Sequence, residues 1–163
     1  MLSLRIYWRI CSLIKQILFK LLLGKRISFG KNTTFRKGFG LYLGYKGHIS
    51  IGDNVFFNRG CSINALNQVN IGSNTLFGEN VKIYDHNHRF RERNLTIREQ
   101  GYKSSPVSIG ENCWICTNVV ILRGVTIGAG SVIGAGCVIK NDIPPNSLVE
   151  LTSSTSVQTI ASS

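Results

Sequence analysis

Acidic residues are missing from the first part of this sequence. Residues 1–50 contain ten lysines or arginines and no aspartate or glutamate, whereas residues 51–163 contain nine bases and eight acids. The net charge of +11 is therefore concentrated in the amino-terminal third. Proline is also scarce, with three residues against seventeen glycines, which excludes a proline-rich linker and collagen. An apolar fraction of 43% over 163 residues is typical of a single ordered domain.

A disulfide framework is not expected either. The five cysteines are an odd number, are widely spread, and follow no cleavable secretion signal. This usage favours a reducing cytoplasm. Cys113 and Cys116 form a C-x-x-C pair, which alone is only a weak sign of metal or redox chemistry.

Long hydrophobic runs are absent from residues 2–23, where basic residues interrupt every apolar stretch. A membrane-spanning helix needs about 20 mostly apolar residues in a row, so this segment is not expected to span a bilayer or to be a signal peptide. At about 100° per residue, a helix would separate a polar face from an aliphatic face. The polar face would carry Arg5, Arg9, Ser12, Gln16 and Lys20. The aliphatic face would carry Ile6, Ile10, Leu13, Ile14, Ile17 and Leu21, with Trp8 and Phe19 near the boundary.

Two interpretations of this basic amphipathic helix, residues 1–26, stay open. It could lie in the plane of an anionic membrane, as a peripheral contact through residues 2–23. Alternatively, it could pack on its own protein or oligomer. Nucleic acid would also attract the charge, but the segment lacks the interleaved polar and aromatic residues that base recognition uses. No nucleic-acid partner is expected.

A strict six-residue period dominates the rest of the chain. The repeated residues are Ile109, Ile115, Ile121, Ile127, Ile133 and Ile139. Small or β-branched residues stand two positions before each of them, at Val107, Cys113, Val119, Val125, Ser131 and Cys137. Fixed repeats indicate a solenoid. In a left-handed parallel β-helix each hexapeptide supplies one short strand and one corner, and three of them complete a triangular coil.

The sequence thus predicts an all-β solenoid over residues 27–149, with about five coils. These coils would begin near Phe29, Ile51, Ile71, Ile109 and Ile127. The frame places Cys61, Cys113 and Cys137 in the interior, and Cys116 where Gly110 and Gly128 stand in their coils. The C-x-x-C pair should therefore face different directions and bind no metal.

One long insertion interrupts the six-residue period. Twenty residues beyond the expected six separate Ile83 from Ile109, and they include two of the three histidines. A solenoid tolerates such an insertion only outside its core, so residues 84–108 are predicted to form a protruding binding loop. Residues 150–163 are expected to form a polar tail.

Four strings carry a family resemblance: IYDHNHRF, SSPVSIGENCWI, NVVILRGVTIGAGSVIGAG and DIPPNS. With them, residues 27–149 resemble the hexapeptide-repeat O-acetyltransferases, which include galactoside, maltose and polysaccharide acetyltransferases. The resemblance implies a homotrimer with its active sites between subunits. It also implies acetyl-CoA as the acetyl donor and a sugar hydroxyl as the acceptor.

The resemblance places the general base on His88. Imidazole suits this role because its unperturbed pKa of about 6.5 leaves it mostly neutral at cytoplasmic pH. His86 and Asp85 are further candidates, which would orient His88, contact the acceptor or shape the turn. No cysteine nucleophile is required.

Substrate positions follow by the same resemblance. Asn58 would contact the acceptor, and Trp114 would lie beside the active-site tunnel or cap the edge of the prism. Thr117 and Ala135 would line the pantetheine groove, and Lys140 stands near the family's basic residue. Phe56 and Leu66 depart from family acceptor positions, and the usual Gly-x-Pro-Ala after the prolines is missing.

Two other functions remain in consideration. A zinc-dependent carbonic anhydrase of this architecture would need three imidazoles, and the chain offers only His48, His86 and His88 at unsuitable spacing; no metal is expected. A catalytically weak or inactive scaffold that binds glycan would keep the solenoid and tolerate loss of His88. The expected function is O-acetylation of a surface polysaccharide or its lipid-linked precursor, in the cytoplasm and at the inner face of the membrane.

Overall fold

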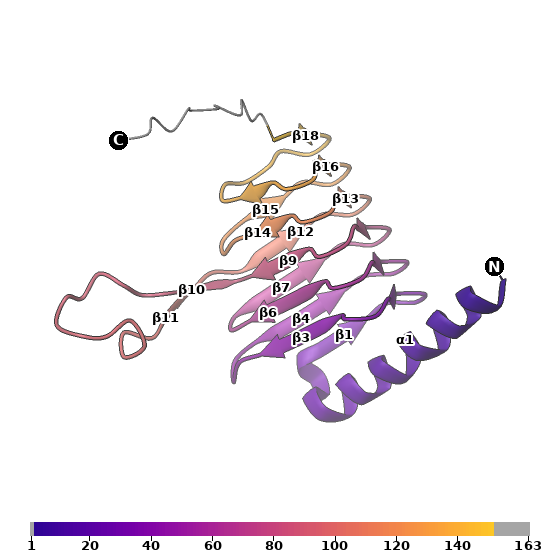
Figure 1. Cartoon of the computed structure of the whole chain (residues 1–163), viewed down its shortest axis with the longest axis horizontal. Helices are drawn as coiled ribbons and strands as arrows, with labels where there is room; N and C mark the ends of the chain where they lie inside the picture. Colours follow the sequence, from indigo (N-terminus) through magenta and orange to yellow (C-terminus); the bar gives the residue numbers. More distant parts are fainter. Residues whose placement is uncertain (1, 152–163) are drawn as a thin grey trace, which may run out of the picture.

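The computed structural model describes residues 2–151, and its strands stack into three parallel sheets around one axis (Figure 1). The chain begins with α1 (Leu2–Leu23) and a short 3-10 helix, η1 (Gly24–Arg26). The first sheet contains β1 (Ile27–Phe29), β4 (His48–Ile51), β7 (Gln68–Ile71), β12 (Val107–Ile109) and β15 (Thr126–Ile127). The second contains β2 (Thr34–Phe35), β5 (Phe56–Phe57), β8 (Leu76–Phe77), β13 (Trp114–Ile115), β16 (Val132–Ile133) and β18 (Leu148–Val149). The third contains β3 (Gly40–Leu43), β6 (Ser62–Ala65), β9 (Lys82–Tyr84), β14 (Val120–Ile121) and β17 (Val138–Ile139).

The predicted left-handed β-helix is confirmed, and the periodic isoleucines form its core. Ile109 pairs with Ile127, Ile115 with Ile133, and Ile121 with Ile139, each one coil further along the axis. All six are at most 4% exposed. Because no single coil can bury its own inward residue, this stacking is what stabilises the solenoid.

The predicted number of five coils is one too low. Ile143 bridges to Ile127, and β18 pairs with β16, which adds a partial sixth turn. Ile143 follows Ile139 by four residues instead of six, so the strict period does not reveal it.

Asparagine and glycine allow the coils to turn and to stack closely. Seven asparagines have positive φ, a conformation that asparagine adopts more readily than most residues. Their side chains also form ladders: Asn54 donates to Asn74 at 3.0 Å and Asn80 to Asn118 at 2.8 Å. A Cβ on Gly110 would lie only 2.5 Å from the Ala129 backbone nitrogen. Glycine is therefore needed where the backbones of successive coils meet.

Helix α1 lies across the first coil and turns Ser12, Gln16 and Phe19 toward it. The buried hydroxyl of Ser12 accepts a hydrogen bond from the Phe35 backbone N–H at 3.1 Å, and the Gln16 side chain donates to the Thr33 carbonyl at 2.7 Å. Phe19 packs near Phe29 and other rings of the first coil. The helix thus caps the open end of the sheets, where strand edges would otherwise be unpaired. No helix within residues 2–151 is long and apolar enough to cross a bilayer.

The long insertion forms an arm that projects from the side of the prism (Figure 1). After β9 the chain leaves the third sheet, and β10 (His86–His88) pairs with β11 (Tyr102–Ser104) in an antiparallel hairpin before β12 resumes the first sheet. This edge of the prism, between the third and first sheets, is called the arm edge below. Of the predicted tail, 150–163, residues 152–163 lie outside the described residues.

Candidate active site

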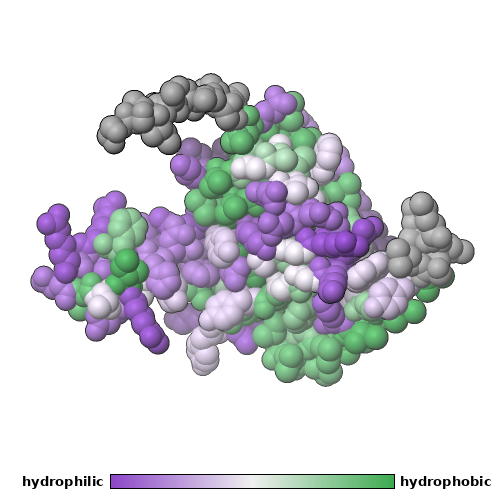
Figure 2. All heavy atoms as spheres, viewed as in Figure 1, coloured by the Kyte–Doolittle hydropathy of each residue, from purple (hydrophilic) through white to green (hydrophobic). Residues whose placement is uncertain are grey.

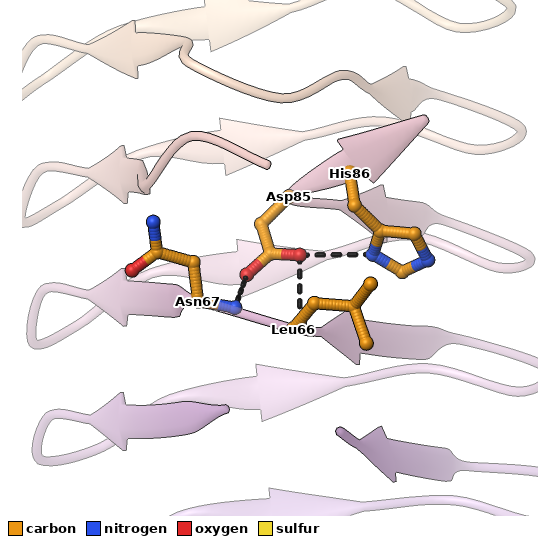
Figure 3. A network of polar contacts seen from close by, with 4 residues as sticks. All are labelled: Leu66, Asn67, Asp85 and His86. Atoms are coloured by element: carbon orange, nitrogen blue, oxygen red, sulfur yellow. Dashed lines mark hydrogen bonds and ion pairs between the residues drawn. The ribbon is translucent and has the colours of Figure 1, made fainter. Parts of the chain in front are cut away.

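The base of the arm is fixed by a buried carboxylate. Asp85 is 0% exposed, and its two oxygens accept backbone hydrogen bonds from Leu66 at 2.8 Å and Asn67 at 2.6 Å (Figure 3). A buried carboxylate needs such partners because its desolvation is costly. Asp85 therefore joins the arm to the preceding coil of the solenoid.

The same carboxylate holds the His86 ring. Nδ1 of His86 lies 2.9 Å from Asp85 Oδ1 (Figure 3), and the His86 side chain is only 14% exposed. A carboxylate can only accept a hydrogen bond, so Nδ1 carries the proton and Nε2 is left as an acceptor. The sequence analysis considered Asp85 as a residue that orients His88, whereas the imidazole that Asp85 contacts is that of His86.

His88 lies two residues further along β10, and therefore on the same side of the strand. Its side chain is exposed, and its ring centroid lies 4.4 Å from that of Tyr102. The Tyr102 ring also packs edge-on against the His86 ring, with the two ring centroids 5.3 Å apart. Among the described residues none hydrogen-bonds the His88 ring. The sequence analysis missed Tyr102, because only the register of the hairpin pairs it with His88.

A hollow of about 660 Å³ opens beside His88. The arm supplies ten of its lining residues, and the solenoid supplies Arg123, from the turn after β14. Nε of Arg123 is buried and has no hydrogen-bond partner among the described residues. Arg123 was not singled out in the sequence, because it stands at an ordinary corner of the repeat. Within residues 2–151, Arg123 is thus the one lining residue that the solenoid contributes to the hollow.

Most of the other predicted site residues lie on a different edge of the prism, between the second and third sheets, called the groove edge below. Trp114 is 53% exposed on β13, and Asn58 follows β5. Thr117 and the exposed Ala135 follow β13 and β16 in successive coils, where the Gly136 N–H donates to the Thr117 carbonyl at 2.9 Å. Thr117 and Ala135 lie in successive coils, Asn58 lies at the same edge two coils earlier, and Trp114 lies on the second sheet just before this edge.

The predicted site residues of one chain are thus divided between two edges. His86, His88 and Asp85 lie at the arm edge, and the exposed Lys140 also lies there because it directly follows β17 of the third sheet. Asn58, Thr117 and Ala135 lie at the groove edge, with Trp114 just before it. The described chain does not bring the two sets together.

All five cysteines are free. Cys61, Cys113 and Cys137 are buried in the core, as predicted, whereas Cys116 is half-buried. Burial raises the pKa of the Cys61, Cys113 and Cys116 thiols. Each thiol is therefore less often ionised at neutral pH than a free one. Within residues 2–151 no three histidine, cysteine or acidic side chains gather as a metal site.

Comparison with known proteins agrees with this fold and with the repeat. Residues 106–141 match the family model described as bacterial transferase hexapeptide (six repeats). The putative lipopolysaccharide biosynthesis O-acetyl transferase WbbJ of Escherichia coli K12 is 34% identical over 152 residues, which cover 89% of this chain and 77% of WbbJ. Galactoside O-acetyltransferase of the same organism is 41% identical over 65% of this chain.

Among solved structures, a hexapeptide-repeat acetyltransferase of Vibrio cholerae O1 biovar eltor complexed with acetyl coenzyme A superposes with a TM-score of 0.69. The two sequences are 29% identical, and the superposed region covers 82% of this chain and 71% of the Vibrio chain. The chain spans 51% of the length of galactoside O-acetyltransferase and 40% to 53% of several other curated relatives. Its likeness to WbbJ extends over most of both proteins. The chain therefore belongs to the family of hexapeptide-repeat acetyltransferases.

Proposed function

We propose that this protein is an acetyl-CoA-dependent O-acetyltransferase that acetylates a sugar hydroxyl, with His88 as the general base. The observation that carries the proposal is the exposed imidazole of His88, which lines the hollow between the arm and Arg123. The names of WbbJ and of galactoside O-acetyltransferase support the reaction, and the Vibrio complex supports the donor.

The reaction needs one proton acceptor and no covalent enzyme intermediate. An imidazole nitrogen of His88 takes the proton of the sugar hydroxyl while its oxygen attacks the thioester carbonyl carbon. The tetrahedral oxyanion needs a positioned hydrogen-bond donor. When the intermediate collapses, the carbon–sulfur bond breaks and the leaving sulfur of CoA takes the proton from the imidazolium. Direct transfer fits the raised thiol pKa values of Cys113 and Cys116.

A homotrimer would complete the site that one chain leaves divided. In a ring of three copies, the arm edge of each chain can face the groove edge of the next. Thr117 and Ala135 of the groove edge would then line the pantetheine of acetyl-CoA, and Asn58 and Trp114 would contact the acceptor. Lys140, at the arm edge, would approach the phosphates of the coenzyme. The separation of the two edges within one chain supports this assembly.

The Asp85–His86 pair favours a second assignment of the base. A carboxylate that fixes an imidazole through Nδ1 leaves Nε2 in position to accept a proton. In our main proposal His86 is instead a positioning residue, which acts through the Tyr102 ring that both histidines contact. Separate substitution of the two histidines distinguishes these assignments.

The proposed acceptor is a surface polysaccharide or its lipid-linked precursor. The likeness to WbbJ, named for lipopolysaccharide biosynthesis, supports this class. A lipid-linked acceptor would bring the enzyme to the inner face of the membrane. The alternative is a scaffold or glycan-binding protein without activity, which the absence of Gly-x-Pro-Ala after the prolines favours.

The test is release of free CoA from acetyl-CoA with a panel of glycan acceptors. We expect His88→Ala to lower kcat roughly 10²- to 10⁴-fold, as for loss of a general base, with the unfolding midpoint unchanged. His86→Ala should cost less. Tyr45→Ala, at a side chain that is 95% exposed, is the control. A large loss with His86→Ala alone would assign the base to His86, and no turnover with any acceptor would favour the scaffold.

A further inference from the structure

Helix α1 presents a wide apolar face to the outside of the molecule. Nine large hydrophobic side chains on it are 50% to 78% exposed: Ile6, Tyr7, Ile10, Leu13, Ile14, Ile17, Leu18, Leu21 and Leu22. Figure 2 shows the hydrophobic surface that extends along the helix. Exposed apolar patches of this extent mark interaction sites.

The way α1 docks explains why this face is left free. An amphipathic helix that serves only as a cap buries its apolar face on its own protein. Here the inward side instead carries Ser12 and Gln16, which hydrogen-bond the open edge of the first coil, together with Phe19. The aliphatic residues that the sequence grouped on one face are therefore turned away from the solenoid.

The charges along α1 indicate what covers the apolar face. On the helical wheel the exposed bases Arg9 and Lys20 stand at one border of the face, and the half-buried Lys15 stands at the other. Residues 1–50 contain no acid that could neutralise them. Two copies of the helix packed face to face would bring like charges together. An anionic lipid surface instead complements the bases and takes up the apolar side chains.

We propose that α1 is an in-plane membrane anchor for surfaces that contain anionic lipid, with its apolar face inserted at the level of the lipid headgroups. The arm projects from the side of the prism, whereas α1 covers the first coil (Figure 1). Membrane contact through α1 would thus leave the hollow beside His88 open to substrates. This binding is independent of the chemistry at His88.

The test is co-sedimentation of the full chain with vesicles of phosphatidylcholine alone or mixed with phosphatidylglycerol. We expect binding to the mixed vesicles and little to the neutral ones. The double variant Leu13→Glu/Ile17→Glu should bind at least roughly tenfold more weakly. The affinity of Arg9→Gln/Lys20→Gln for the mixed vesicles should fall roughly fivefold per base removed. Added salt should also weaken binding of the wild type. Leu148→Glu, at a side chain that is 64% exposed on β18, at the opposite end of the second sheet from β2, is the matched control and should bind like the wild type.

Light scattering and thermal unfolding of each variant accompany the binding measurement. Because the substituted side chains are exposed, we expect the fold and the subunit number to be unchanged. Two results would overturn the proposal: no binding of the wild type to anionic vesicles, or full binding by Leu13→Glu/Ile17→Glu. A change in subunit number in that variant, with no vesicle binding by the wild type, would show that a second copy covers the face.

Discussion

Oδ1 of the buried Asp85 carboxylate lies 2.9 Å from Nδ1 of His86. The same carboxylate accepts hydrogen bonds from two backbone N–H groups of the preceding coil, so it links an imidazole on the protruding arm to the solenoid. His88, two residues further on, extends beyond this fixed point toward the hollow. The arm therefore combines a hydrogen-bonded base with an exposed candidate for catalysis.

Asp85→Ala should destabilise the protein. The substitution leaves the Leu66 and Asn67 N–H groups without their acceptor, which we expect to lower the free energy of unfolding by about 2–4 kcal/mol. Urea titration measures this loss. His86→Ala removes only the imidazole and serves as the comparison. An equal stability for the two variants would contradict the structural role of the carboxylate.

The isoleucine ladder should dominate stability. Ile121 is 0% exposed, so Ile121→Ala is expected to cost about 2–5 kcal/mol of unfolding free energy. Ile97 on the arm is 56% exposed, and Ile97→Ala should change stability by less than about 0.5 kcal/mol. Thermal and urea unfolding of both variants check this contrast. Similar losses at the two positions would contradict a core confined to the prism.

Cys113 and Cys116 should react slowly with iodoacetamide near neutral pH. Burial raises the pKa of the Cys113 and Cys116 thiols, so the neutral form persists to higher pH and the reactive thiolate is depleted at pH 7. The alkylation rate should rise as pH increases, and Cys116→Ala should retain CoA release. Rapid alkylation at pH 7 that abolishes turnover would contradict direct acetyl transfer.

Arg123 should contribute to substrate binding. Its buried Nε has no partner among the described residues and lies at the hollow that His88 lines. Arg123→Gln is expected to lower kcat/KM roughly 10- to 100-fold through the loss of a charged hydrogen bond to a ligand. Arg98→Gln, on the arm but outside the lining of the hollow, is the control. Identical kinetics for both variants would assign Arg123 a purely structural role.

The repeat was sufficient to predict the fold, because an error-free period of isoleucines fits one stacked geometry. It failed only at Ile143, where the spacing shortens, and it did not reveal the left-handed asparagines at the corners. The amphipathicity of residues 2–23 was also visible. The sequence did not show which side of the helix docks on the solenoid, because the docking depends on the unpaired backbone edge at Thr33 and Phe35.

The site was less accessible from sequence. The histidines and the projecting insertion followed from the broken period and the family motif. The contact between Tyr102 and His88 depends on the hairpin register, and the place of Arg123 beside the arm depends on the tertiary structure. The Asp85–His86 pair was not predicted, because the sequence alone does not distinguish an inward from an outward side chain at the point where the period ends.

The central claim is that His88 of one subunit acts on substrates held at the groove edge of the next, and mixed trimers test it most directly. His88→Ala removes the base, and Ala135→Trp, at an exposed position, obstructs the groove edge. Each variant alone should release almost no CoA from acetyl-CoA in the presence of an acceptor. Co-refolded in equal amounts, they should recover about one quarter of wild-type activity, the fraction of interfaces that pair an intact arm with an intact groove. Mixed assemblies that form, as shown by differential tagging, and yet stay inactive would contradict a site shared between subunits.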